Sequence, residues 1–196
     1  LPKDAKSFQV WCIDKFPGAG KWISEDSRAK LGVRPISLFE VTTKLLERIL
    51  TKRINKIMET HAMWNVAQMG FRENFAAVEA MSIYRSIIED AYHNKKKIFL
   101  SSNDCTQAYD SIATWVMEII YKDRGFPPSL VKLLTNMDTN QIGTILTGVG
   151  ATDPFEKLCG LGQGSSIAPL KWNLFLNPLL NWQDTFEDKY VIGDTC

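Results

Sequence analysis

The segment KKKIFLSSNDCTQAYDSI, residues 95–112, joins an apolar run to two acidic residues. The run Ile98–Leu100 is short and lacks helical periodicity, which favours a buried strand over a helix. Asp104 follows at the carboxyl end of this expected strand, and Asp110 comes six positions later. An acid at the end of a buried strand is held rigidly, where it can meet another acid and a divalent cation. The segment therefore predicts a strand that presents a metal-binding carboxylate.

Both acids also have an ordinary structural interpretation. Asp104 can be a turn residue, and Asp110 can cap a helix that follows the turn. For an arbitrary strand, turn and helix, this interpretation is the more frequent one. Spacing alone therefore favours it, and a function for Asp104 needs evidence from other segments.

The surrounding sequence predicts mostly helices. The spacing of apolar residues and the helix-start signals indicate five helices, over residues 40–61, 74–92, 111–125, 127–137 and 170–182. Asp110 or Ser111 is expected to cap the third helix, and Gly125 to end it. The second helix, capped by Asn74, is expected to bury five side chains, namely Val78, Met81, Ile87, Ile88 and Ala91.

Strands are expected to be few. Between Gln141 and Cys159, two extended segments flank the glycine-containing turn TGVGA and predict a hairpin. A last strand is expected to begin at Tyr190, and Pro178 is expected to kink the long helix before it. Helices segregated around a few strands are typical of an α+β fold and differ from a regular βαβ series.

Charge and cysteine content narrow the class of protein only slightly. The 23 basic and 22 acidic side chains give a net charge of +1, so any binding of nucleic acid would depend on local residues. The four cysteines lack metal-site spacing and follow no secretory segment, so we expect reduced thiols and an intracellular protein of the cytoplasm or nucleus. No apolar run approaches the roughly 18 residues of a membrane span, so no membrane is expected as a partner.

Four segments carry a resemblance to a known family. They are VRPISLFEVTTKLLERIL, AQMGFRENF, NDCTQAYDSI and GLGQGSSIAPLKWNLFLNPLL, in this order along the chain. In this order they resemble the fingers and palm motifs of reverse transcriptases, most closely those of non-LTR (LINE-like) retrotransposons. The resemblance covers the chain from about Leu31 onward, whereas the first thirty residues match only vaguely.

The resemblance implies an α+β fold of the right-hand polymerase type. Residues 1–94 would form a fingers-like region, and residues 95–196 part of the palm, with a fingers-like hairpin near residues 138–159. The family carries two adjacent aspartates on a later hairpin, and no Asp-Asp pair occurs in these 196 residues. We therefore expect a piece that is truncated before the Asp-Asp hairpin and the thumb, with the remainder of a polyprotein as a partner.

The resemblance also implies an activity, that of an RNA-directed DNA polymerase. Such an enzyme copies an RNA template onto a DNA primer from deoxynucleoside triphosphates, using two Mg²⁺ ions. Asp104 matches the family's first catalytic, metal-binding aspartate, and the main-chain carbonyl of Cys105 would be a further ligand. Because one carboxylate cannot hold two ions, we expect this piece to be inactive alone.

Other matched residues would hold the substrates. The nucleotide would be bound by Tyr109, Gln163, Arg34, Lys44 and Arg48, and the template and primer by Arg72, Gly162 and Gly164. In the family the tyrosine lies under the sugar, and a guanidinium suits phosphate through its planar donors. Ordinary interpretations stay open, since Tyr109 can be a packed aromatic residue and the basic side chains can be a solvated helix face.

Other classes of function also stay open. A relic of such a polymerase domain can bind nucleic acid through Arg34, Lys44 and Arg72 without any chemistry. A decayed copy without present function would keep the same motifs. A dinucleotide-dependent enzyme is less favoured, because GLGQGSS lacks the Gly-x-Gly-x-x-Gly pattern and follows no early strand.

Overall fold

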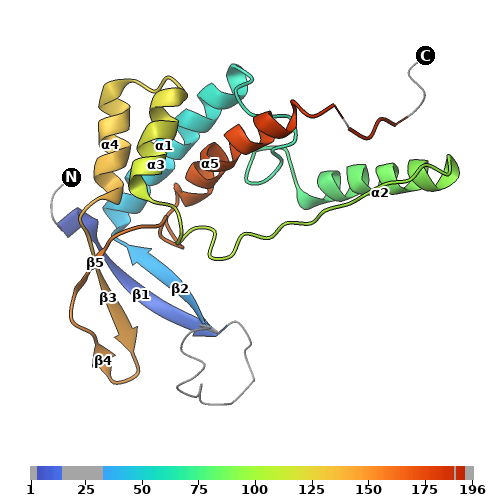
Figure 1. Ribbon diagram of the computed structural model, residues 1–196. Coiled ribbons are helices and arrows are strands. Elements are labelled where there is room, and N and C mark those ends of the chain that lie inside the picture. The colour runs from blue at the N-terminus through green and yellow to red at the C-terminus, as the bar shows by residue number, and fades with distance from the viewer. Residues whose placement is uncertain (1–3, 15–32, 188, 193–196) are drawn as a thin grey trace. The chain divides into compact units, whose positions relative to one another are not determined.

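The computed structural model describes residues 4–14, 33–187 and 189–192 (Figure 1). They form two compact units, which are described separately. The first unit contains residues 1–52 and 107–171, and the second contains residues 53–106 and 172–196. These units are defined by compactness alone. The boundary expected between the fingers-like and palm-like regions, at residues 94 and 95, therefore stays a prediction.

A mixed sheet forms one side of the first unit. After a short 3-10 helix, Asp4–Lys6, its strands are β1 (Ser7–Asp14), β2 (Val33–Phe39), β3 (Gln141–Thr147), β4 (Gly150–Ala151) and β5 (Phe155–Lys157). The order is β2-β1-β3-β4, and β5 also pairs with β3. β1 is antiparallel to β2 and parallel to β3 (Figure 1). The sheet therefore brings Ser7–Trp11 beside residues more than a hundred positions later.

The core of this sheet is small and aromatic. Phe8, Val10 and Phe39 are buried together, with Ile145 packed against them. Phe8 and Val10 alternate with exposed residues along β1, as expected for a strand with one buried face. Pro35 lies in β2, which is an edge strand of the sheet. A proline is tolerated there, because its missing N–H removes no hydrogen bond from a central strand. The sequence pattern predicts neither β1 nor β2.

The helices occur close to where periodicity predicts them. They are α1 (Val41–Thr60), α2 (Ala77–His93), α3 (Thr114–Asp123), α4 (Pro128–Asp138) and α5 (Ala168–Gln183). Gly125, with φ of +72°, follows α3 as expected, and Pro128 stands at the start of α4. Pro178 lies inside α5. No helix in the described ranges is both long and apolar enough to cross a membrane.

The expected hairpin between Gln141 and Cys159 is confirmed. β3 and β4 pair in antiparallel register, with Leu146 opposite Ala151 and Thr147 opposite Gly150. The Thr147 hydroxyl donates to the Gly150 carbonyl at 2.7 Å and closes the turn. Together with the helices, these strands give a mixed fold of helices and one mixed sheet within the described residues.

The strand expected at Ile98–Leu100 does not form. These residues have no regular structure, and Phe99 is 94% exposed. A strand is stable only when a neighbour completes its hydrogen-bond ladder, and no described strand pairs with this segment. The strand expected from Tyr190 is also absent through Ile192, and the residues after Ile192 lie outside the described part.

The helix expected at residues 74–92 is confirmed as α2, but three of the five side chains expected to be buried are exposed. The helix begins at Ala77 after Ala76, whose N–H donates to the Glu79 carboxylate at 2.8 Å, and Asn74 is not its cap. Ala91 is its one buried residue, whereas Val78, Met81 and Ile88 are exposed. Helical periodicity identifies an apolar face, but it does not show that another element covers that face.

A buried ion pair connects α4 to the start of α5 within the first unit. The Lys171 ammonium lies 2.6 Å from both carboxylate oxygens of Asp138, and the two side chains are 3% and 10% exposed. Breaking such a pair leaves one charge buried without a partner, which costs much more than the net stability of the pair itself.

We expect Lys171→Met to lower the free energy of unfolding by about 3 kcal/mol, because the Asp138 carboxylate would lose its ion-pair partner. Lys132→Met, at an exposed lysine of α4, is the matched control and should change it by less than about 0.5 kcal/mol. Urea unfolding followed by circular dichroism measures both. Equal stability of the two variants would contradict the expected role of the pair.

Candidate functional site

The candidate site is built around a glycine loop, residues 160–165, in the first unit. The Ser37 N–H of β2 donates to the Gln163 carbonyl at 2.6 Å. Gly164 has φ of +112°, and a side chain there would overlap the carbonyl oxygen of Ser37. Gly162 packs against the Phe39 ring, where an added Cβ would come within 2.7 Å. The glycines therefore let the loop backbone lie directly against β2.

A second segment, the Tyr109 turn (residues 107–112), holds the other side of the loop. The Leu161 N–H donates to the Tyr109 carbonyl at 2.6 Å, and the Gly160 N–H donates to the Ile112 carbonyl at 2.7 Å. Gly160, at φ of +90°, lies so close that a Cβ would be 2.9 Å from the Asp110 Cα. Backbone hydrogen bonds thus join β2, the glycine loop and the Tyr109 turn.

Asp110 contacts the glutamine of the loop through its side chain. Gln163 Nε2 donates to Asp110 Oδ2 at 2.9 Å. The expectation that Asp110 or Ser111 caps the next helix is wrong, because α3 begins at Thr114 with Ala113 in the cap position. Tertiary pairing with the loop replaces the local capping role.

Glu47 anchors the end of the loop, and sequence reasoning missed it. This residue of α1 is 4% exposed, and its carboxylate accepts from the Ser165 hydroxyl at 2.8 Å and the Ser166 N–H at 2.7 Å. Burial raises the pKa of the Glu47 carboxyl, although these two hydrogen bonds oppose the shift. The sequence signal was an acid on the buried stripe of α1 that contains Thr43, Ile54 and Met58.

The other expected nucleotide-binding residues differ in how far their side chains are buried. Tyr109 is partly buried, and burial raises the pKa of its phenol. Lys44 is partly buried in α1, whereas Arg48 is exposed. Arg34 lies in β2, opposite Ile13, but its side chain lies outside the described part. The roles of these four residues stay predictions.

Lys157 is a further basic residue near the loop that the sequence did not single out. Its amine donates to Gln141 Oε1 at 2.9 Å and lies 6.0 Å from the centre of the Phe8 ring. Burial lowers the pKa of this lysine, while the charges of Asp138 and Asp110 oppose that shift. Lys157 therefore provides a partly desolvated positive charge in the same unit as the loop.

Arg72 lies in the second unit and has many internal partners. Its Nε and Nη2 donate to the two carboxylate oxygens of Glu59 at 2.8 and 2.7 Å, and its Nη1 donates to the Gln68 carbonyl at 2.8 Å. The guanidinium also lies 4.5 Å from the centre of the Phe75 ring, and its side chain is 10% exposed. These contacts hold the segment after α1 in place, and contact of Arg72 with a template stays a prediction.

Asp104 and Cys105 are exposed in the second unit and outside any strand. A carboxylate and a carbonyl are oxygen donors of the type that Mg²⁺ prefers, but they supply too few ligands for two ions. Within the described ranges, no group of three His, Cys, Asp or Glu side chains could hold a metal. The described residues therefore do not form a two-metal centre. Because the loop belongs to the other unit, its approach to Asp104 stays a prediction.

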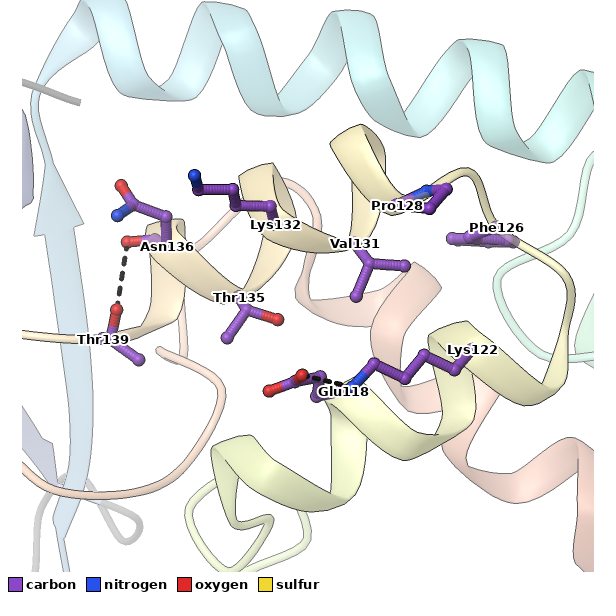
Figure 2. Close-up of a pocket in the computed structure, with 9 residues that line it drawn as sticks. All are labelled: Glu118, Lys122, Phe126, Pro128, Val131, Lys132, Thr135, Asn136 and Thr139. Atoms are coloured by element: carbon purple, nitrogen blue, oxygen red, sulfur yellow. Dashed lines mark hydrogen bonds and ion pairs between the residues drawn. The ribbon is translucent and has the colours of Figure 1, made fainter.

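A separate cleft in the first unit lies between α3 and α4 (Figure 2). Its volume is ≈ 440 Å³. Phe126 and Val131 line it with apolar surface, and Glu118 and Lys122 form an ion pair of 2.6 Å at its edge. None of the residues expected to bind substrate lines this cleft. It is therefore not the candidate site.

Comparison with known proteins matches residues 25–193 to the family model "Reverse transcriptase (RNA-dependent DNA polymerase)". The chain is 28% identical over 176 residues to "Probable RNA-directed DNA polymerase from transposon BS" of Drosophila melanogaster, covering 89% of this chain and 18% of that protein. It is 25% identical over 148 residues to the R2DM retrotransposable-element Pol polyprotein of Drosophila melanogaster, covering 75% and 14%.

A similar polyprotein, from the type-1 retrotransposable element R2 of Popillia japonica, is 25% identical over 150 residues, covering 75% of this chain and 20% of that protein. The matched segments thus span between 14% and 20% of the length of these curated relatives.

The close backbone approach at Gly164 gives a sharp test of the loop geometry. We expect Gly164→Ala to lower the free energy of unfolding by at least about 2 kcal/mol, from the left-handed backbone and the overlap with Ser37. Gly148→Ala is the matched control, because nothing lies within 4 Å of its added Cβ. Urea unfolding compares the two. A Gly164→Ala protein as stable as the control would refute the described contact with β2.

Glu47 should give stability a dependence on pH with a defined sign. Because the folded pKa is raised above the ordinary value of 4.5, the folded state binds the proton more tightly than the unfolded state. The stability of the wild-type chain relative to Glu47→Gln should therefore fall as the pH rises from about 4.5 through the folded pKa.

A second variant, Glu47→Ala, tests whether the Glu47 carboxylate anchors the end of the glycine loop. Glu47→Gln keeps an acceptor for the Ser166 N–H and should fold, whereas Glu47→Ala leaves that donor without a partner and should cost about 1–3 kcal/mol. Thermal unfolding between pH 4 and pH 8 measures both effects. A relative stability that rises with pH would contradict the raised pKa.

Proposed function

The chain belongs to the reverse transcriptase (RNA-dependent DNA polymerase) family, and from this membership we propose that it supplies the fingers and part of the palm of an RNA-directed DNA polymerase of a non-LTR retrotransposon. Its substrates would be an RNA template, a DNA primer and deoxynucleoside triphosphates. The observation that carries the proposal is the joining of three motif segments in the first unit. Ser37 donates to the Gln163 main-chain carbonyl, and Leu161 of the same glycine loop donates to the Tyr109 carbonyl, so backbone hydrogen bonds connect three separate motifs.

The geometry suits the binding of a nucleotide beside the glycine loop. Tyr109 presents a partly buried aromatic side chain that can pack under a sugar, and Gln163 presents an amide from the adjoining loop. Gly162 and Gly164 allow the loop to follow the chain of β2, from which Arg34 would reach the triphosphate. Lys44 and Arg48 would add positive charge from α1. Each part is a local feature of the first unit.

The metal in this proposal is Mg²⁺, which would supply the activation of the primer hydroxyl. Members of the family generally use a divalent metal. Asp104 and the carbonyl of Cys105 would hold it, as part of a larger set of oxygen ligands. Since the described residues do not complete that set, we expect the 196-residue chain to bind substrates without catalysing synthesis.

The proposal for Arg72 is narrower than the sequence alone suggested. Its bidentate pairing with Glu59 and its bonds to main-chain carbonyls fix the segment that carries it. We propose that the Arg72 side chain acts on the template and primer mainly by shaping this segment. The neighbouring exposed residues, such as Phe71, would then make the direct contacts.

A second candidate function is a nucleic-acid-binding relic without chemistry. The exposed position of Asp104, outside any strand and any cluster of metal-binding side chains in the described ranges, favours it. The two candidates differ in one measurable property. A relic binds RNA or DNA through basic side chains, with affinity that falls steeply with salt, and has no magnesium-dependent affinity for nucleotides.

We expect the isolated chain to give no template-dependent primer extension, and to bind a fluorescent deoxynucleoside triphosphate more tightly with Mg²⁺ than with EDTA. Asp104→Asn should remove the magnesium effect, because its carboxylate is the expected ligand. Asp153→Asn, at another exposed acid, is the matched control. Binding of RNA without any magnesium-dependent nucleotide binding would favour the relic, and primer extension by the isolated chain would contradict the expected inactivity.

A further inference from the structure

We propose that Asp110 is a positioning residue, which fixes the side-chain amide of Gln163 so that its carbonyl oxygen is the group presented to a ligand. The class of ligand, a nucleotide, comes from the proposed function. The orientation of the amide does not depend on that function. The orientation follows from the chemistry of the two side chains.

The hydrogen bond between the two side chains selects one orientation of the amide. Asp110 Oδ2 lies 2.9 Å from Gln163 Nε2. An ionised carboxylate can only accept hydrogen bonds, so the amide must turn its NH₂ group toward Asp110. A reversed amide would place its carbonyl oxygen against the carboxylate, where two acceptors repel each other. The side-chain carbonyl oxygen of Gln163, Oε1, therefore points away from Asp110.

The backbones of both residues are held independently of this hydrogen bond. The Asp110 N–H donates to the Gln107 carbonyl at 2.9 Å, and Gly160 packs against the Asp110 backbone. The main-chain carbonyl of Gln163 accepts from the Ser37 N–H at 2.6 Å. Because both attachment points are fixed, the remaining freedom lies mainly in the side chains. Asp110 removes the rotation of the amide and leaves the loop itself unchanged.

The presented group is a hydrogen-bond acceptor. Within the described part of the chain, the Gln163 side chain hydrogen-bonds to Asp110 through its NH₂ group. The Gln163 side chain is also partly exposed. Its oxygen can therefore accept from a ligand donor. On a nucleotide, the donors of this kind are a sugar hydroxyl and a base N–H.

Two substitutions separate positioning from a merely structural tie. Asp110→Asn keeps a hydrogen bond to Gln163 but offers both a donor and an acceptor, so the amide can adopt either orientation. Asp110→Ala removes the partner altogether. We expect Asp110→Asn to keep the thermal stability near that of the wild-type chain and to bind deoxynucleoside triphosphate at least about twofold more weakly, because only part of the population is competent.

Asp110→Ala should weaken nucleotide binding further, by about fivefold, as the amide rotates freely. Asp153→Asn is the control for loss of an acidic charge and should bind as the wild-type chain does. The orientation itself is read without ligand, from the ¹⁵N-labelled side-chain amide signals of Gln163. These signals should shift in both Asp110 variants and stay unchanged in Asp153→Asn. Unchanged amide signals in Asp110→Ala would overturn the inference.

The ligand titrations use deoxythymidine triphosphate, its 2′,3′-dideoxy form and inorganic tripolyphosphate. Weaker binding of the dideoxy form identifies a sugar hydroxyl as the donor. Equal binding of the two nucleotides, with weaker binding of tripolyphosphate, identifies the base, whereas equal binding of all three probes would overturn the assignment of a nucleotide donor to the Gln163 oxygen. Equal affinity of the wild-type and Asp110→Ala chains for the nucleotide would overturn the positioning role. If the wild-type chain binds none of the three probes, the proposed function and the nucleotide assignment fail together, while the amide signals still decide whether Asp110 orients Gln163.

Discussion

The site depends on the contact of three backbones that only glycine permits. The chain near Gln163 lies between β2 and the Tyr109 turn, and on each side an N–H of one segment meets a carbonyl of another. At Gly160 and Gly164 the backbone is left-handed and the neighbouring chain occupies the space of a Cβ. Segments separated by dozens of residues are thereby held by main-chain groups, whose geometry is independent of side-chain rotamers. The positions of Tyr109 and Gln163 follow from that frame.

Two carboxylates then fix what the backbone leaves free, and they do so in different ways. Glu47 is nearly fully buried and accepts from Ser165 and Ser166, so it joins the end of the loop to α1 at the cost of desolvating its charge. Asp110 is partly exposed and bonds one rotatable amide. The first interaction contributes to the stability of the loop, and the second contributes to the chemistry that the loop presents. A motif that names only the glutamine and the glycines therefore leaves out the two carboxylates that help to make the site.

The sequence predicted what depends on local pattern and failed where the outcome depends on a distant partner. The five helices, the glycine Gly125 that follows α3, and the hairpin of β3 and β4 follow from periodicity and turn chemistry. β1 was missed, because its pattern of alternating burial is short and its partners lie far along the chain. Ile98–Leu100 is predicted as a strand because the apolar run is short and lacks helical periodicity, yet a strand needs a hydrogen-bond ladder that this local pattern cannot supply. The motifs identified Tyr109 and Gln163, but neither the partner of Asp110 nor the role of Glu47 could be read from spacing.

The separation of binding from chemistry has a physical basis in this chain. The glycine loop, the Tyr109 turn and their two carboxylates are held by interactions inside the first unit, and none of those interactions involves Asp104. A metal centre requires several oxygen ligands at once, so it is lost when a single acid is missing or displaced. The loop has no such requirement, since its contacts are mostly between main-chain groups. A chain that loses its acids therefore keeps the geometry of the loop, and under the proposed function the retained motifs around the loop are evidence for nucleotide binding before they are evidence for synthesis.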